Sequence, residues 1–254
     1  MASQITRLLE IMATLRDPQR GCEWDMAQTS ATIVPHTIEE AYEVADAIGR
    51  GDADEIKDEL GDLLFQVVFQ ARIADEAGQF DIYDVARSIS DKLVARHPHI
   101  FAGAEPDLNL REERWEAIKA DERLKKGASS ALDGVAHALP ALLRAEKLQK
   151  RAARTGFDWP DVGGPLAKIH EEIKELAEAN SEDEQKEEAG DLLFAVVNLV
   201  RTYGINAEEA LRAANHKFET RFKAMEHLAG PQFPALSLDE QEDLWQRVKS
   251  NERS

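Results

Sequence analysis

The chain has 254 residues, of which 43% are hydrophobic and 31% are charged, so it holds enough apolar material for a core and a wholly disordered chain is excluded. Its 49 acidic residues outnumber the 31 lysines and arginines, which gives a formal net charge of −18 at pH 7. A surface this acidic repels nucleic-acid polymers and anionic membranes, so we expect neither as a partner.

Apolar residues recur at three- and four-residue steps along ten segments, which is the pattern of amphipathic helices. In chain order these segments are 4–16, 38–48, 55–76, 82–96, 111–124, 135–153, 166–179, 184–203, 207–228 and 238–250. Asp81 and Asn206 stand where helix N-caps are expected, and glycines and prolines fall between the segments. Strand-length alternation of polar and apolar residues is absent, so the sequence predicts an all-α protein built from helical bundles.

An internal repeat divides the chain on either side of a small, polar stretch at 125–130. Each half contains a Glu-Glu-x-x-Glu element followed by Glu-x-Gly-Asp-Leu-Leu-Phe, at 39–43 and 59–65 in the first half and at 171–175 and 188–194 in the second. We therefore predict a tandem duplication, with an N-terminal repeat over 1–124, a linker over 125–134 and a C-terminal repeat over 135–254.

Each repeat has four acidic residues that a helical hairpin brings together. Residues three apart share a helix face, and the turn between the two acidic elements is short, so the two helices run antiparallel. The residues concerned are Glu40, Glu43, Glu59 and Asp62 in the first repeat, and Glu172, Glu175, Glu188 and Asp191 in the second. Four carboxylates in one place repel each other unless a cation is bound, and oxygen ligands favour Mg²⁺, with Mn²⁺ as an alternative.

A solvated acidic helix face is the ordinary explanation of Glu-Glu-x-x-Glu in a chain this acidic. Asp62 and Asp191 are more informative, because each immediately precedes Leu-Leu-Phe on a strongly apolar helix, where an unpaired acid is expensive. Since both elements occur twice at nearly the same spacing, we predict a metal site in each repeat.

Other enzyme classes leave no signal in the chain. None of the seven histidines has a glutamate three residues before it, which argues against a ferritin-like di-iron site, and neither a P-loop nor a Gly-x-Ser-x-Gly motif occurs. Lys217 and Arg221 lie four residues apart and can contact phosphate oxygens or form surface salt bridges. Trp245 can stack on a base or anchor the last helix.

Several strings together resemble the MazG-type nucleoside triphosphate pyrophosphohydrolases in their long, two-repeat bacterial form. Besides the acidic elements they are Gly-Cys-Glu-Trp-Asp at 21–25, Arg-His-Pro-His-Ile-Phe at 96–101, and the stretches 139–142, 147–153, 156–159 and 215–222. The resemblance covers nearly the whole chain. It implies an all-α, Mg²⁺-dependent enzyme that hydrolyses nucleoside triphosphates, ATP among them, to the monophosphate and pyrophosphate, and that forms homodimers.

The resemblance also implies roles for individual residues. Glu172, Glu175, Glu188 and Asp191 would hold Mg²⁺ in the second repeat, and Glu171 or Glu187 would activate water, a choice that the sequence leaves open. Lys168, Lys217 and Arg221 would contact the phosphates, with Glu171 beside them and Trp245 on the nucleoside side. His36 occupies the first-repeat position of Lys168 and is largely neutral at pH 7, so we expect the second repeat to carry most of the turnover.

Two alternatives remain open: a dUTPase-type enzyme restricted to one nucleotide, and a non-catalytic helical module that keeps its metal ligands. The base and sugar preference cannot be read from the residues. The N-terminal stretch lacks a signal-peptide pattern, and the single Cys22 forms no internal disulfide, so we expect a cytoplasmic protein.

Overall fold

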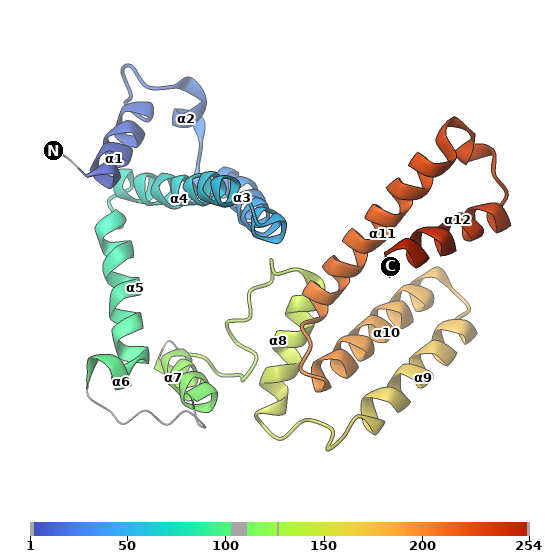
Figure 1. The fold of residues 1–254 in the computed structure, drawn as a ribbon. Coiled ribbons are helices and arrows are strands. Elements are labelled where there is room, and N and C mark those ends of the chain that lie inside the picture. Colours follow the sequence, from blue (N-terminus) through green and yellow to red (C-terminus); the bar gives the residue numbers. More distant parts are fainter. Residues whose placement is uncertain (1–2, 103–110, 126, 253–254) are drawn as a thin grey trace. The chain divides into compact units, whose positions relative to one another are not determined.

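The computed structural model describes residues 3–102, 111–125 and 127–252, and these residues form helices and turns without a strand (Figure 1). The all-α prediction is confirmed. The chain divides into two compact units, Met1–Glu116 and Ala117–Ser254, and the division falls within α7, Arg111–Lys125. The domain limits expected from the sequence stay a prediction. No helix in the described part of the chain is long and apolar enough to cross a membrane.

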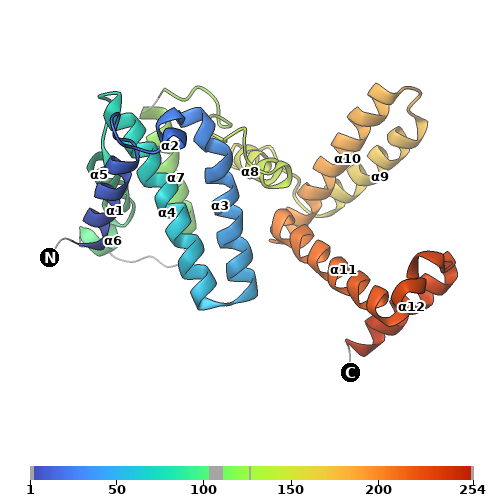
Figure 2. The same ribbon diagram turned by 90° about the horizontal axis from the view of Figure 1, so that it is seen from above.

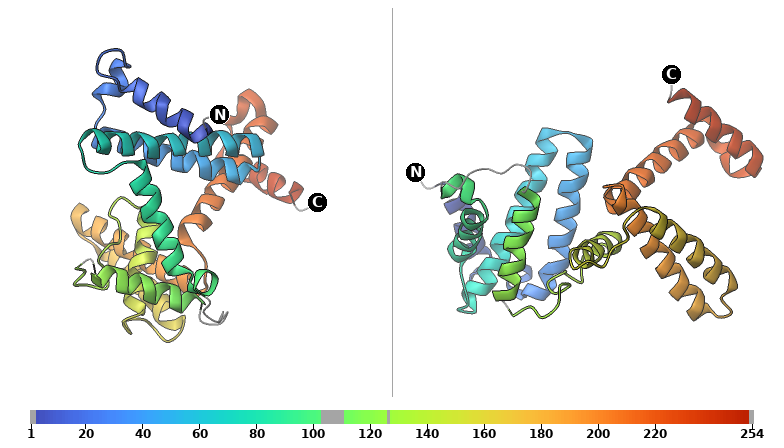
Figure 3. Two further views of the ribbon diagram at one scale, coloured as in Figure 1. Left: turned by 90° about the vertical axis from the view of Figure 1, so that its left-hand side faces the viewer. Right: turned by 90° about the horizontal axis from the view of Figure 1, so that it is seen from below.

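The first unit is organised around an antiparallel pair of long helices. Its elements are α1 (Gln4–Leu15), α2 (Glu23–Ala27), α3 (Ser30–Arg50), α4 (Ala53–Glu76), α5 (Ile82–Arg96) and α6 (Pro98–Phe101), followed by the beginning of α7. α3 and α4 lie side by side (Figure 3) and are joined by Gly51, whose positive φ of 80° suits glycine. α1 packs on α4, and the core of this unit joins Met12 of α1, Ile33 of α3, and Val68 and Phe69 of α4.

The second unit repeats the antiparallel pair and adds a helical arm. It contains α8 (Ala141–Ala153), α9 (Gly163–Glu178), α10 (Glu182–Thr202), α11 (Ala207–Ala229), the 3₁₀ helix η1 (Gly230–Ala235) and α12 (Leu238–Asn251). α9 packs along α10, and α8 packs on α10 and α11. α11, η1 and α12 share their own core, and Figure 2 shows the α11–α12 arm diverging from the α9–α10 pair.

The two predicted helix caps are confirmed, whereas several predicted helix limits are wrong. The side chains of Asp81 and Asn206 cap α5 and α11 as predicted, each accepting a hydrogen bond from a backbone N–H three residues later. α3 begins at Ser30 rather than at residue 38, because Thr29 and Thr32 form a capping box and the helix continues through Pro35. The predicted helix 135–153 begins only at Ala141, after Pro140. The short helices α2, α6 and η1 were not expected.

Candidate metal centres

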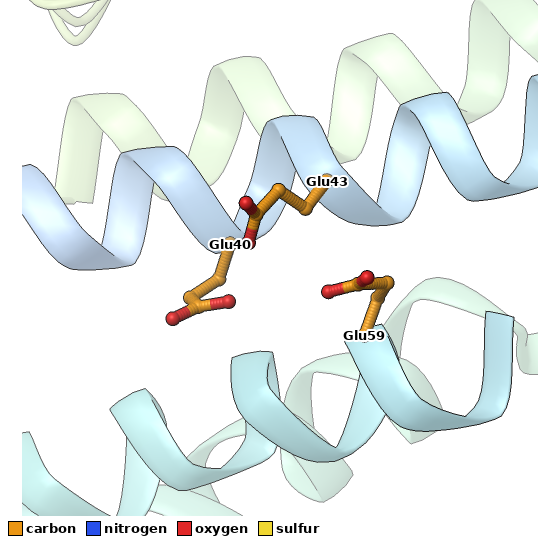
Figure 4. A group of neighbouring side chains, drawn as sticks. All are labelled: Glu40, Glu43 and Glu59. Atoms are coloured by element: carbon orange, nitrogen blue, oxygen red, sulfur yellow. The ribbon is translucent and has the colours of Figure 1, made fainter. Parts of the chain in front are cut away.

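The first acidic cluster lies between α3 and α4. One carboxylate oxygen from each of Glu40, Glu43 and Glu59 lies within 4.8 Å of the other two. Figure 4 shows Glu40 and Glu43 on α3 and Glu59 on α4, with the Glu40 and Glu59 carboxylates in the space between the helices. The pKa of Glu40 is raised by burial, by a hydrogen bond shared with Glu43 and by the charge of Asp62. Asp62 therefore acts on the cluster although it lies outside the closest three.

The second acidic cluster lies between α9 and α10 and has the same design. Oxygens of Glu172, Glu188 and Asp191 lie within 4.8 Å of one another. The pKa of Glu188 is raised by burial first and then by the charge of Glu175, followed by that of Glu172, so the fourth predicted ligand also acts on this cluster. The structure thus brings together the predicted four acidic residues in each unit, three closely and the fourth within electrostatic range.

Glu172 is the most constrained member of the second cluster. Its side chain is only 2% exposed. One carboxylate oxygen, Oε1, accepts a hydrogen bond from Lys168 at 2.5 Å, whereas the buried Oε2 has no hydrogen-bond partner. A buried carboxylate oxygen without a partner is costly, and a hard cation would satisfy it. The donor set therefore fits Mg²⁺ or a similar ion.

The two units differ in the cation next to the acidic cluster. Lys168 binds Glu172 and also Glu171, at 2.9 Å, and both carboxylates raise the pKa of the lysine. At the matching position of the first unit, His36 faces Glu39 at 3.6 Å and lies 5.9 Å from the ring of Trp24. The second cluster consequently has a permanent positive charge beside it that His36 does not supply when neutral.

The remaining predicted site residues lie elsewhere. Glu187 is exposed on α10 next to Glu188. Lys217 and Arg221 lie on α11 and Trp245 on α12, and none of the three makes a hydrogen bond or ion pair with the acidic clusters within the described residues. Instead, Arg221 binds the carboxylate of Glu252 at 2.7 Å and stacks 5.4 Å from the Trp245 ring. Within the described residues, the structure therefore does not join Lys217, Arg221 or Trp245 to either acidic cluster of the same chain.

A cavity of about 760 Å³ opens beside the second cluster and was not foreseen from the sequence. It is lined by Lys168, Glu172 and Asp191 together with side chains from α8, α10 and the segment before α9. Gln149, Asp158, Asn198 and Arg201 are polar residues of the lining that were not predicted as site residues from the sequence. The available signal was Asn198 itself, a polar residue on the buried face of an apolar helix.

Comparisons with known proteins agree with this geometry. The family model "MazG nucleotide pyrophosphohydrolase domain" matches twice, at residues 28–101 and 165–225, which include both acidic clusters. The chain is 51% identical to the nucleoside triphosphate pyrophosphohydrolase of Escherichia coli K12, over 98% of each chain. It is 44% identical to the nucleoside triphosphate pyrophosphohydrolase/pyrophosphatase MazG of Thermotoga maritima, over 97% of this chain and 96% of the relative. The two matches confirm the tandem repeat.

Proposed function

We propose the following activity for this chain, which belongs to the MazG family of nucleotide pyrophosphohydrolases: it hydrolyses nucleoside triphosphates, ATP among them, to the monophosphate and pyrophosphate. The observation that carries the proposal is the acidic cluster of the second unit, in which one buried Glu172 oxygen has no hydrogen-bond partner. The chain that holds this cluster matches a nucleoside triphosphate pyrophosphohydrolase over nearly its full length. Nucleoside triphosphates are intracellular metabolites, so we place the activity in the cytoplasm.

Glu172, Glu175, Glu188 and Asp191 are the residues that would hold Mg²⁺, or Mn²⁺ in its place. A cation bound there would neutralise the triphosphate and stabilise the charge that develops during attack on the α-phosphorus. The equivalent set in the first unit, Glu40, Glu43, Glu59 and Asp62, would hold a second ion. The close approach of three carboxylate oxygens in both units supports this assignment.

Lys168 has two tasks in this proposal. Without substrate it pairs with Glu171 and Glu172 and offsets part of their charge. With a triphosphate bound, its ammonium group donates hydrogen bonds to phosphate oxygens, which are strong because both partners are charged. The proton of the attacking water passes to Glu171 or Glu187. The variants Glu171→Gln and Glu187→Gln distinguish these two candidates, because only the replacement of the true proton acceptor lowers kcat while KM stays unchanged.

Lys217, Arg221 and Trp245 contact the nucleotide from a second copy of the chain in our proposal. They lie on the α11–α12 arm, which diverges from the α9–α10 pair of its own unit. Within a homodimer the arm of one copy meets the acidic site of the other, so that Lys217 and Arg221 reach the phosphates and Trp245 the nucleoside.

Exposed apolar side chains support the homodimer. Leu193 and Phe218 are each 58% exposed and Ile173 is 50% exposed, on α10, α11 and α9 respectively. Two of these side chains lie on α9 and α10, the helices that hold the acidic site, and exposed apolar side chains of this size are typical of a surface that a partner covers. A second copy of the chain provides the same helices and therefore a matching apolar surface.

The activity is tested by incubating the purified chain with Mg²⁺ and a panel of ribo- and deoxyribonucleoside triphosphates, and separating the products by anion exchange. We expect monophosphate and pyrophosphate from several nucleotides. Diphosphate and inorganic phosphate as the main products would refute the reaction. Turnover of a single nucleotide would favour the dUTPase-type alternative, and no turnover would favour a non-catalytic module.

A further inference from the structure

The cavity in the second unit continues the acidic site. Its lining includes Lys168, Glu172 and Asp191, and also Phe157, Trp159 and Asn198. Its volume of about 760 Å³ lies within the range of about 300–1,000 Å³ that is usual for small-molecule pockets. A ligand whose charged end meets the acidic cluster can therefore place an uncharged end among the aromatic side chains.

Two amides in the cavity lining have unused hydrogen-bonding atoms of opposite kind. Gln149 is buried and donates from Nε2 to the backbone oxygen of Phe194 at 2.8 Å, which leaves its Oε1 without a partner. Asn198 is also buried, and its Oδ1 accepts from Arg201 Nη2 at 2.6 Å, which leaves Nδ2 as a donor. These partners fix the orientation of both amides, so the lining has one free acceptor and one free donor.

The aromatic wall of the cavity is held in place by specific contacts. Arg201 binds both carboxylate oxygens of Asp158, at 2.6 and 3.1 Å, and so ties the segment that contains Phe157 and Trp159 to α10. The indole of Trp159 lies directly against the first turn of α9, where a Cβ on Gly164 would be 2.0 Å from the ring. Glycine at 164 is therefore required for this position of the indole.

The first unit has larger side chains at two positions that line this cavity in the second unit. Counting from the shared acidic motif, Asn198 matches Phe69 and Ala195 matches Gln66. Phe69 is fully buried in the core, and Gln66 is buried with its Nε2 directed to Glu40 at 3.5 Å. The two units thus share an acidic cluster but differ in the size of the side chains next to it.

We propose that the cavity binds the base of the nucleoside triphosphate, with Phe157 and Trp159 against its faces and the Gln149 and Asn198 amides at its polar edge. This inference rests on the proposed function. Each nucleobase carries hydrogen-bond donors and acceptors along its edge, which suits one free acceptor and one free donor. Phe69 and Gln66 leave less room for a base in the first unit, so we expect the nucleoside to be selected mainly in the second unit.

The test compares two ligands in direct binding experiments by calorimetry with Mg²⁺ present. One ligand is an ATP analogue with a methylene group between the α- and β-phosphorus atoms, which is not cleaved, and the other is inorganic tripolyphosphate, which lacks the nucleoside. The variants are Asn198→Phe, which introduces the first-unit residue, and Trp159→Ala, which removes the aromatic wall in a segment outside the helices. Val196→Phe is the matched control, because it adds the same ring to α10 outside the cavity lining.

Loss of base stacking or of the pocket volume corresponds to roughly ten- to hundredfold weaker binding of the analogue. We expect this loss for Asn198→Phe and Trp159→Ala, with tripolyphosphate binding nearly unchanged, and neither change for Val196→Phe. Unchanged analogue binding in Trp159→Ala, or an equal loss for both ligands, overturns the pocket while leaving the proposed function intact. A wild-type chain that binds neither ligand contradicts the proposed function and the pocket together.

Discussion

The strongest test of the metal centre is the response of stability to Mg²⁺ when Glu188 is replaced by glutamine. Glutamine has nearly the same shape as glutamate, so the substitution removes the charge and leaves the packing nearly unchanged. The carboxylate of Glu188 lies close to those of Glu172 and Asp191. Burial and the neighbouring charges raise its pKa, so the folded apo protein is destabilised once Glu188 ionises. That loss of stability develops as the pH rises from the ordinary pKa of a glutamate through the raised pKa of Glu188. The apo Glu188→Gln variant is therefore expected to be at least as stable as the wild type at pH 7.

With Mg²⁺ bound, the wild type is expected to be more stable than the Glu188→Gln variant. At a free Mg²⁺ concentration one hundred times Kd, binding to the folded state alone contributes about 2.7 kcal/mol. For a unit of this size that corresponds to a rise in Tm of roughly 8–14 °C. Glu188→Gln removes a ligand, so most of the rise is lost from the second unit.

Differential scanning calorimetry with EDTA and with saturating MgCl₂ measures both effects. Glu178→Gln is the matched control, because Glu178 is an exposed acid on α9 outside the cluster. The control should retain the full Mg²⁺ shift. If Glu188→Gln shows the same Mg²⁺ shift as the wild type, or is clearly less stable without metal, the carboxylates are surface acids and the reasoning is refuted.

Two further predictions concern the units and their assembly. Glu188→Ala should remove most nucleotide hydrolysis at neutral pH, whereas Glu59→Ala should remove little. His36→Lys in the Glu188→Ala background should recover part of the lost hydrolysis, because a charged contact to phosphate increases affinity roughly ten- to a hundredfold. Steady-state kinetics check this, and a larger loss in Glu59→Ala would place the main site in the first unit. Leu193→Asp should convert the proposed homodimer to monomers and abolish hydrolysis, because it puts a charge on the exposed apolar surface of α10. Sedimentation velocity measures the change, and a wild-type chain that is already monomeric and active would contradict the dimer.

The parts of the fold that depend on local sequence could be predicted. Asp81 and Asn206 identified two helix starts because capping involves only neighbouring residues. The acidic clusters could also be predicted, since a short turn forces two helices to run antiparallel and the spacing of the glutamates then fixes a common face. The start of α3 could not, because Pro35 reads as a boundary unless the capping interaction of Thr29 is known to precede it.

The cavity and the position of Arg221 required the structure. Asn198 reads as one polar residue on an apolar helix, and only the packing of the second unit shows that a cavity lies next to it. Likewise, the spacing of Lys217 and Arg221 defines a shared face of α11 but not the element opposite it. Arg221 pairs with Glu252, thirty-one residues later, a contact that no local pattern indicates.

The first unit retains its acidic cluster although it has His36 at the position of Lys168 and Phe69 at the position of Asn198. Burial and mutual repulsion raise the pKa values of Glu40 and Glu59, so the ionised cluster destabilises the first unit at neutral pH when no cation is bound. A cation between α3 and α4 would remove that repulsion and fasten the two longest helices of the unit together. The charge difference at His36 and the volume difference at Phe69 are independent of each other, yet both disfavour a nucleotide in the first unit. The same four carboxylates therefore suit a structural ion in one unit and a catalytic ion in the other, and the residues around them decide which.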